Sequence, residues 1–436
     1  MIINQTHISL CAVILLALLM PITTFAQSGG SFTITQSTVA GGGGAAGNGS
    51  FGVNGTSGQM AAGTQMTNSP YTEFGGFWTD FLTPTATAAE IAGQVVDANG
   101  NSLAGVAVRL TGTQNRLTIT DAHGNYRFDN VETNGLYVIT PARANYVFVP
   151  GQMTFSQLGA HTEATFTANQ TGNNLNPLDT TEYFVRQQYV DFLHREPDEA
   201  GFNFWVNNIE SCGADQTCRE VKRIDTSAAF FLSIECQQTG YLVQRLYQAA
   251  YGDLANEPVP ITLSDFNSEA PKISAGVIVN RNGWQAILKS NQDAYLSDFV
   301  QRARFAAAYP STLTPAEYVD KLFTNAGVSG AGADRTKAIN EFGTANTSGD
   351  PKARARALRD VADSPSVTQQ EFDSAFVLMQ YFGYLQRDPN SGPDTNFSGY
   401  QFWLDKLDTF NGNYQSAEMV KAFMTSNEYR RRFGTK

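Results

Sequence analysis

The sequence predicts a multidomain protein in which a small antiparallel β-sandwich is followed by an all-α helical repeat region. Residues 90–168 alternate apolar and polar side chains in short segments separated by Asp, Asn and Gly, as short strands do. Residues 179–436 instead space their apolar side chains three and four apart, as amphipathic helices do. One helical pattern that starts at residue 184 recurs at residue 376, which indicates an internal repeat.

Composition excludes several classes of protein. The 436 residues include 29 Lys and Arg against 40 Asp and Glu, a net charge of −11, and no basic run. Because phosphate affinity depends on clustered cations, we expect no nucleic-acid partner. The 42% of hydrophobic residues excludes a wholly disordered chain. No apolar stretch reaches the roughly 18 residues of a transmembrane helix, so no span is expected after signal cleavage.

Residues 1–26 are predicted to be a signal peptide. Ile8 to Met20 is apolar except for one Ser, and Thr24 and Ala26 supply the small residues that a signal peptidase reads. The first seven residues contain no Lys or Arg, so a short membrane anchor is the alternative. Cleavage after Ala26 predicts a secreted, extracellular or cell-surface protein.

Residues 27–88 form a Gly-rich segment and linker in which residues 32–35 and 51–53 are predicted strands. Residues 42–47 match the G-x-G-x-x-G pattern of dinucleotide sites. That site requires a helix after the loop, and no helical pattern follows here. Trp78 is a less constrained aromatic residue that could contact a ligand.

The predicted sandwich has seven or eight short strands. A turn at Asp97–Asn101 is expected to join the first two strands, and a turn at Asp121–Asn125 the next two, with Gly supplying positive φ. The predicted strands are residues 91–96, 106–110, 117–120, 126–128, 136–140, 147–149, 153–155 and 163–167.

Residues 93–106 and 120–128, with Gly-Gln-Val-Val-Asp and Asp-x-x-Gly-Asn-Tyr-Arg-Phe, resemble the carboxypeptidase regulatory-like domain. The resemblance covers residues 90–168 and implies a transthyretin-like sandwich, grouped with carbohydrate-binding-like folds. It also implies an accessory or binding module without catalytic residues. Tyr126, Tyr137 and Tyr146 are the sandwich residues that combine a ring with a polar tip, so we name them as possible ligand contacts.

Two oxygen-rich segments leave calcium open. The two Asx-rich turns carry Asp97, Asn99, Asp121 and Asn125, and residues 388–396 are rich in Asp and Asn. The alternative is that these residues form turns and cap the next helix. The second segment lacks the Gly and Glu that an EF-hand requires. We therefore assign no metal ligands and no cofactor, and keep calcium as possible.

The helical pattern is a repeat of a short signature. Repeat 1 occupies residues 179–256, a helical connecting region residues 257–365, and repeat 2 residues 366–436. Seven residues recur in this order: Phe184, Val185, Gln188, Tyr189, Leu193, Arg195 and Pro197 return as Phe376, Val377, Gln380, Tyr381, Leu385, Arg387 and Pro389.

The repeat continues with a Gly-x-x-Phe-Trp element that ends at Trp205 and again at Trp403, where we expect core packing. The whole pattern resembles DUF4214, a family of all-helical modules of bacterial secreted and surface proteins related to phycobilisome linker domains. The resemblance implies location and assembly and no settled activity.

Helix ends are predicted from capping patterns. Capping boxes are expected at Asp179–Glu182 and Thr314–Glu317. Arg195 and Arg387 are expected to end the first helix of each copy, where a cation favours the helix dipole.

The three cysteines after residue 26 suit an oxidising compartment. Cys212 and Cys218 flank a short polar loop, and we predict a disulfide between them. Cys236 is expected to be a small buried apolar residue.

No catalytic residues are predicted. No His-x-x-Glu, His-Glu-x-x-His or Gly-x-Ser-x-Gly motif is present, which removes zinc peptidase and serine hydrolase signatures. A pair of carboxylates brought together by folding stays open, because sequence does not give their separation.

The sequence therefore favours an exported non-catalytic binding protein. Its sandwich would bind carbohydrate, as a glycan, or a cell-surface protein, and its helical modules would serve surface assembly. The alternative is a structural, S-layer-type protein that self-associates, for which calcium dependence stays open. An unrecognised hydrolase is the third hypothesis.

Overall fold

The computed structural model describes residues 88–434 except 157, 159, 160 and 331, and before residue 88 only the backbone of six short strands. The signal peptide predicted at residues 1–26 and the aromatic residue Trp78 lie outside the described residues. The glycine-rich stretch 42–47 lies on a strand that pairs antiparallel with the next one, so it is not the loop of a dinucleotide site. The six strands are β1 (Ser28–Gly29), β2 (Phe32–Thr33), β3 (Gly42–Asn48), β4 (Phe51–Ser57), β5 (Met66–Asn68) and β6 (Tyr71–Glu73).

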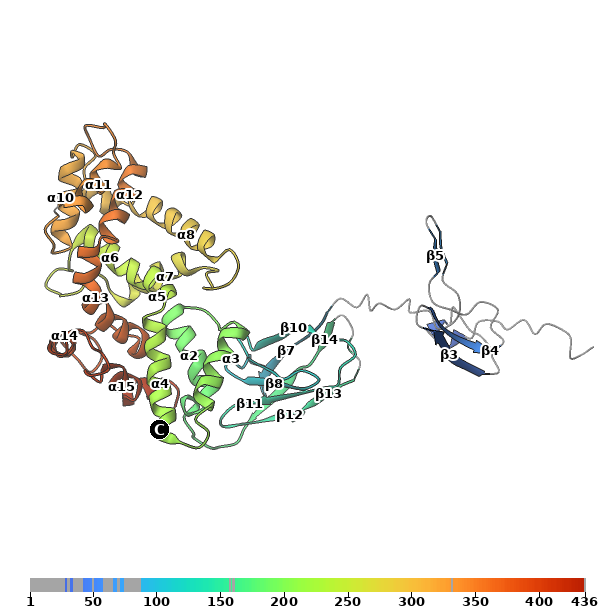
Figure 1. Cartoon of the computed structure of the whole chain (residues 1–436). Helices are drawn as coiled ribbons and strands as arrows, with labels where there is room; N and C mark the ends of the chain where they lie inside the picture. The colour runs from blue at the N-terminus through green and yellow to red at the C-terminus, as the bar shows by residue number, and fades with distance from the viewer. Residues whose placement is uncertain are drawn as a thin grey trace, which may run out of the picture. The chain divides into compact units, whose positions relative to one another are not determined.

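The chain divides into two compact units, Met1–Thr87 and Ala88–Lys436. The second unit begins with the sandwich. One sheet has the order β10-β7-β15-β12 with β14 also paired to β7, and the other the order β13-β11-β8-β9 (Figure 1). The strands are β7 (Ala89–Asp97), β8 (Ala107–Gly112), β9 (Arg116–Ile119), β10 (Asn125–Val131), β11 (Tyr137–Ala142), β12 (Tyr146–Val149), β13 (Met153–Phe155), β14 (His161–Glu163) and β15 (Phe166–Gln170).

The first seven predicted strands form as β7 to β13, whereas the strand predicted at residues 163–167 is divided between β14 and β15. The pairing of the strands also differs from the prediction. The two predicted hairpin turns form, with Gly100 and Gly124 at positive φ. However, β7 and β8 lie in different sheets, as do β9 and β10. Strand β7 instead pairs antiparallel with β10 and parallel with β14 and β15, so this sheet is mixed. A turn fixes the local reversal of the chain, whereas the choice of partner strand depends on long-range packing.

Alternating side chains of both sheets fill the core of the sandwich. The inward set includes Ile91, Val108, Phe128, Ile139 and Phe166, each fully buried. Because side chains alternate between the faces of a strand, the residues between them point outward.

The rest of the second unit is helical. Within the described residues, no helix is both long and apolar enough to cross a bilayer. The helices are η1 (Pro177–Asp179), α2 (Thr181–Leu193), α3 (Glu199–Glu210), α4 (Gln216–Phe231), α5 (Ile234–Gln238), α6 (Gly240–Tyr251), α7 (Leu263–Ser274), α8 (Trp284–Phe299), α9 (Ala303–Ala308), α10 (Pro315–Asn325), α11 (Gly332–Asn340), α12 (Pro351–Ala362), α13 (Pro365–Gln380), η2 (Tyr381–Leu385), α14 (Ser398–Thr409), α15 (Met419–Met424) and α16 (Asn427–Arg431).

The two copies of the repeat pack against each other. The rings of Phe192 on α2 and Tyr384 on η2 meet edge to face with centroids 5.0 Å apart. Beside them, Arg432 forms an ion pair of 2.8 Å with Asp191, which is 2% exposed. A serine cap between two helices occurs at Ser233 and Ser426, and a third time at Ser364.

The sandwich and the first repeat share one interface. Buried residues of β8 and β9 belong to the same apolar cluster as the helices. The Arg116 Nε atom donates to the Glu199 carboxylate at 2.6 Å, and Asn203 on α3 donates to the Leu117 carbonyl at 2.8 Å. Strand β9 thus lies directly against α3.

One of the two predicted capping boxes is confirmed. Thr314 and Glu317 exchange both capping hydrogen bonds at the start of α10. The box predicted at Asp179–Glu182 is wrong, because Asp179 ends the short helix η1 and α2 starts after Thr180, which makes no side-chain cap. Asp179 instead forms an ion pair with Arg430 at 2.8 Å.

Candidate functional site

Two of the predicted ligand contacts in the sandwich lie in its core. Tyr126 is 4% exposed and donates its hydroxyl to the Ala164 carbonyl at 2.5 Å. Tyr137 is fully buried and donates to the Glu132 carbonyl at 3.0 Å. Burial raises the pKa of both hydroxyls, because it disfavours the charged form. Neither ring is therefore available to a ligand.

Tyr146, the third predicted contact, lies at the edge of a pocket. It begins β12, is only partly buried, and lines a cavity of about 250 Å³. The other walls come from the start of the linker to the helices and from Phe433 near the end of the chain. Gln170 donates its side-chain amide to the Tyr146 hydroxyl at 3.4 Å. The pocket is therefore built by both the sandwich and the helical region.

Arg143 forms one wall of this pocket. Its guanidinium lies against the Tyr146 ring at 5.2 Å and the Tyr183 ring of α2 at 5.4 Å. Its Nη1 atom donates to the Ala104 carbonyl at 2.5 Å, whereas its enclosed Nε has no hydrogen-bond acceptor. Burial lowers its pKa, but an arginine stays protonated at neutral pH.

No carboxylate of the described residues pairs with Arg143. The charged residue that most affects it is another cation, Arg186, which is itself paired with Glu196. The pocket therefore contains a partly buried positive charge without a counter-ion. Such a charge favours a ligand that brings a negative group.

Asn145 shapes the loop that closes the pocket. Its side chain donates to the Leu175 carbonyl at 2.8 Å and accepts from the Leu175 amide at 2.9 Å. These two bonds hold residues 171–175 across the end of β12. Gln170, Asn173 and Asn174 then contribute amide groups to the pocket wall. Amides supply both donors and acceptors, which suits a ligand rich in hydroxyl groups.

The polar side chains that line this pocket are one cation and several neutral groups. Its lining contains arginine, tyrosine, asparagine and glutamine, and no Asp, Glu, His or Cys. Of the side chains that usually act as general acid, general base or nucleophile, the lining contains a tyrosine. The arrangement can bind and orient a polar ligand.

The repeat signature builds a second pocket, of about 520 Å³, on the first repeat. Arg195 donates from Nε and Nη2 to Glu235 at 2.6 and 3.0 Å, and its guanidinium lies over the Tyr189 ring at 4.9 Å. A Cβ on Gly201 would lie 2.3 Å from the Tyr189 hydroxyl, so this position requires glycine. Arg195 lies beyond the end of α2 and pairs with a carboxylate, where a helix-dipole contact was predicted.

The second repeat makes the same contacts. Arg387 pairs with Glu428 and lies over the Tyr381 ring at 5.2 Å. A Cβ on Gly399 would lie 2.8 Å from the Tyr381 hydroxyl. Trp403 packs on Phe423 at 5.5 Å, as Trp205 packs on Phe230 at 5.7 Å. Both tryptophans are partly buried against the core, in agreement with the packing role predicted for them.

The 520 Å³ pocket on the first repeat has an apolar rim. Phe204 is 62% exposed and Ile234 is 56% exposed, and both line it. The equivalent of Phe204 in the second repeat, Phe402, is 56% exposed. Exposed apolar residues at equivalent positions are a signal for contact with another chain.

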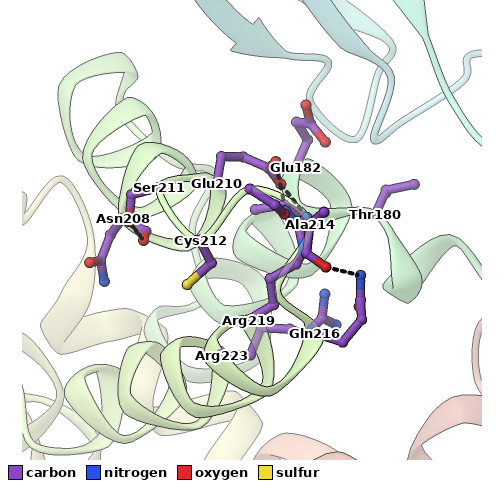
Figure 2. A network of polar contacts seen from close by, with 12 residues as sticks. Thr180, Glu182, Asn208, Glu210, Ser211, Cys212, Ala214, Gln216, Arg219 and Arg223 are labelled. Atoms are coloured by element: carbon purple, nitrogen blue, oxygen red, sulfur yellow. Dashed lines mark hydrogen bonds and ion pairs between the residues drawn. The ribbon is translucent and has the colours of Figure 1, made fainter.

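The predicted disulfide is confirmed between Cys212 and Cys218, which join the end of α3 to the start of α4. Arg219 also holds this loop, because it donates to Glu210 at 2.5 Å and to the Gly213 carbonyl at 3.1 Å (Figure 2). Cys236 is free and buried, as predicted, and burial raises the pKa of its thiol to about 12. It is therefore unreactive at neutral pH.

The oxygen-rich segments have protein partners. Asp97 accepts from the Asn99 amide at 2.8 Å, and Asp121 from the His123 amide at 2.8 Å, so both form Asx turns. In residues 388–396, Asp388 accepts from the Leu263 amide at 2.7 Å. Across the described residues, no group of three or more His, Cys, Asp and Glu is placed to hold a metal ion.

A third groove, of about 770 Å³, brings two carboxylates to one polar surface. Asp373 on α13 and Asp408 on α14 both line it. Burial and the nearby Asp408 charge raise the pKa of Asp373.

Sequence reasoning named Tyr146 and missed Arg143. The signal that identifies Arg143 is the lack of an acidic partner in three dimensions, which sequence does not contain. The sequence contains a signal against Tyr126 as a ligand contact. Side chains alternate along a strand, so Tyr126 lies on the same inward face as Phe128, whereas Asn125 and Arg127 lie on the outward face.

Comparisons with known proteins give a domain assignment. A solved structure, the Bacillus anthracis TIE protein, matches at 13% identity with a TM-score of 0.17. The match covers 19% of this chain and 16% of that chain, so the chain spans a small part of that protein. No curated protein matches the chain.

Family models match two adjoining segments. Residues 90–176 match the carboxypeptidase regulatory-like domain, and residues 165–221 match the domain of unknown function DUF4214. The two segments overlap at residues 165–176. They cover the sandwich, the linker and the first repeat as far as the start of α4, in the two parts for which the sequence suggested these families. The chain therefore carries a carboxypeptidase regulatory-like domain followed by a DUF4214 domain.

Proposed function

We propose that this protein is an exported, non-catalytic carbohydrate-binding protein whose ligand occupies the pocket at Arg143 and Tyr146. The observation that carries the proposal is the composition of that pocket. A partly exposed tyrosine ring, a guanidinium and three side-chain amides converge on a cavity of about 250 Å³. A sugar ring offers both an apolar face for an aromatic side chain and hydroxyl groups for amides.

The size of the pocket limits the ligand. Sites for drug-sized molecules typically measure about 300–1,000 Å³. The smaller volume here fits one sugar unit, which would be the end or a side branch of a longer glycan. Affinity for a single unit is expected to be modest.

The pocket lining has no Asp, Glu, His or Cys, the side chains that most often act as acid, base or nucleophile, and this supports binding without catalysis. The lining also has no carboxylate that would hold calcium, because Ca²⁺ prefers several carboxylate and carbonyl oxygens. We therefore expect binding to be independent of calcium.

A glycan array tests this function. The chain of residues 27–436 would be screened in calcium and in EDTA beside two variants, Tyr146→Ala and Val147→Ala. Val147 is exposed on the same strand and does not line the pocket, so it controls for changes on β12. We expect saturable binding in both buffers that is lost in Tyr146→Ala and kept in Val147→Ala. Absence of saturable binding, or its survival in Tyr146→Ala, would refute the proposal.

Export is part of the proposal and has its own test. The disulfide is consistent with an oxidising compartment, and the apolar N-terminal run is consistent with a signal peptide. N-terminal sequencing of protein recovered outside the cytoplasm should start at Gln27. Recovery from the cytoplasm with Met1 intact would refute export.

Self-association through the helical repeats is a second candidate function. The exposed Phe204 and Ile234 beside the 520 Å³ pocket, and the exposed Phe402 on the other repeat, favour it. An apolar knob on one repeat and an apolar pocket on the other would join copies head to tail. Light scattering across a concentration series should show growing mass that Phe402→Ser abolishes. A constant monomer mass at all concentrations would exclude it.

A further inference from the structure

We infer that the ligand of the Arg143 pocket carries a carboxylate, so that the protein selects acidic sugars such as uronic acids over neutral ones. This inference rests on the proposed function, because it specifies the sugar that the same pocket would bind. The observation behind it is the positive charge of the Arg143 guanidinium in the pocket wall.

The first step is that the positive charge is real and uncompensated. Arg143 lies between the rings of Tyr146 and Tyr183 and donates to the neutral Ala104 carbonyl, and no carboxylate of the described residues pairs with it. Several other arginines of this unit are paired with carboxylates, for example Arg186 with Glu196, whereas Arg223 resembles Arg143 in that it donates to a backbone carbonyl and lies over an aromatic ring. A partly buried guanidinium without such a partner costs free energy that a bound anion would recover.

The second step is that Arg143 is held in place. The Ala104 carbonyl fixes one side of the guanidinium, and the two rings restrict its plane. The enclosed Nε has no acceptor, so the side chain does not satisfy itself within the fold. A preorganised cation loses little entropy on binding, which favours selectivity for the charged ligand.

The third step separates an acidic sugar from other anions. A phosphate site usually gathers several cations or the amides at a helix N-terminus, and here one arginine is surrounded by a ring and amides. One guanidinium matches one carboxylate, and the amides of Gln170, Asn173 and Asn174 match ring hydroxyls. The net charge of −11 also opposes non-specific attraction of polyanions.

The test compares a sugar acid with its ester. Isothermal titration calorimetry on the chain of residues 27–436 would use trigalacturonate and its full methyl ester, in which a methyl group on each carboxyl removes the charge. We expect the acid to bind at least roughly tenfold more tightly than the ester, as the loss of a hydrogen bond between charged groups implies. Arg143→Gln should remove this preference while keeping the weak affinity for the ester.

Two controls keep the result interpretable. Arg127→Gln removes the same charge from an exposed arginine on β10 that does not line the pocket, and it should keep the preference for the acid. Arg143→Lys retains a positive charge and should therefore keep part of the preference for the acid over the ester. Circular dichroism would verify that each variant is folded.

Each outcome decides between the two claims. Equal affinity for acid and ester would overturn the inference and leave carbohydrate binding standing. Binding of the acid that Arg143→Gln does not reduce would also overturn it. If neither sugar binds but a short peptide with a free C-terminal carboxylate does, the site recognises peptide termini, and both this inference and the proposed function are wrong.

Discussion

Removing the carboxylate of Glu235 should destabilise the helical region much more than removing its counterpart in the second repeat, Glu428. Glu235 is 4% exposed and is a bidentate partner of Arg195, whereas the Glu428 side chain is 34% exposed. Each arginine keeps a second carboxylate, Asp198 at 3.3 Å from Arg195 and Asp394 at 2.7 Å from Arg387, so burial is what separates the two pairs. Breaking the buried pair should cost about 3 kcal/mol, and Glu428→Gln about 1 kcal/mol.

Urea unfolding followed by far-ultraviolet circular dichroism measures this difference, because the signal comes mainly from the helices. With an m-value of about 3 kcal/mol per molar urea, Glu235→Gln should lower the midpoint by about 1 M, and Glu428→Gln by about a third of that. Equal midpoints for the two variants would refute the reasoning, since burial is the main difference between the pairs. A neutral Glu235→Gln would mean that water reaches the pair.

Three further predictions concern a glycine of the first repeat, a partly buried carboxylate and the disulfide. Gly201→Ala should destabilise the first repeat by about 1–3 kcal/mol, measured in urea, because its Cβ would meet the Tyr189 hydroxyl at 2.3 Å. Asp373→Asn should stabilise the protein at pH 7. The pKa of Asp373 is raised in the folded state, so its charged carboxylate opposes folding at neutral pH. Thermal melts should show that this gain in stability vanishes as the pH falls toward the ordinary pKa of 3.8. Reduction of the disulfide should cost no more than about 2 kcal/mol in the same unfolding assay, because Arg219 still holds the short loop.

Local patterns in the sequence predict the strands, turns and helices of this fold, but they do not predict which strands pair with each other. The turn at Asp97–Asn101 forms as expected because one carboxylate accepts two backbone amides within the turn. The strand after that turn nevertheless enters the other sheet. Strand pairing is decided by which apolar faces meet across the core, and that depends on residues far apart in the chain.

The candidate site was predictable in part for a related reason. Tyr146 was named from its chemistry, and the same chemistry named the buried Tyr126 and Tyr137. Side-chain alternation along β10 separates Tyr126 from the surface, whereas the missing counter-ion of Arg143 appears only when every neighbouring element is in place. Charge balance is a property of the folded surface, so a charged site of this kind requires the structure.

Repetition within the chain separates residues that the fold requires from residues that a ligand would use. The Tyr, Arg, Gly, Trp and Glu of the signature make the same contacts in both copies, so architecture alone accounts for them. The Arg143 pocket has walls from three parts of the second unit: Tyr146 of the sandwich, Pro177 of the linker and Phe433 beyond the last helix. Tyr183 of α2 also stacks on Arg143. The sandwich by itself lacks the walls from the linker and the helices, so under the proposed function neither module would bind the ligand alone.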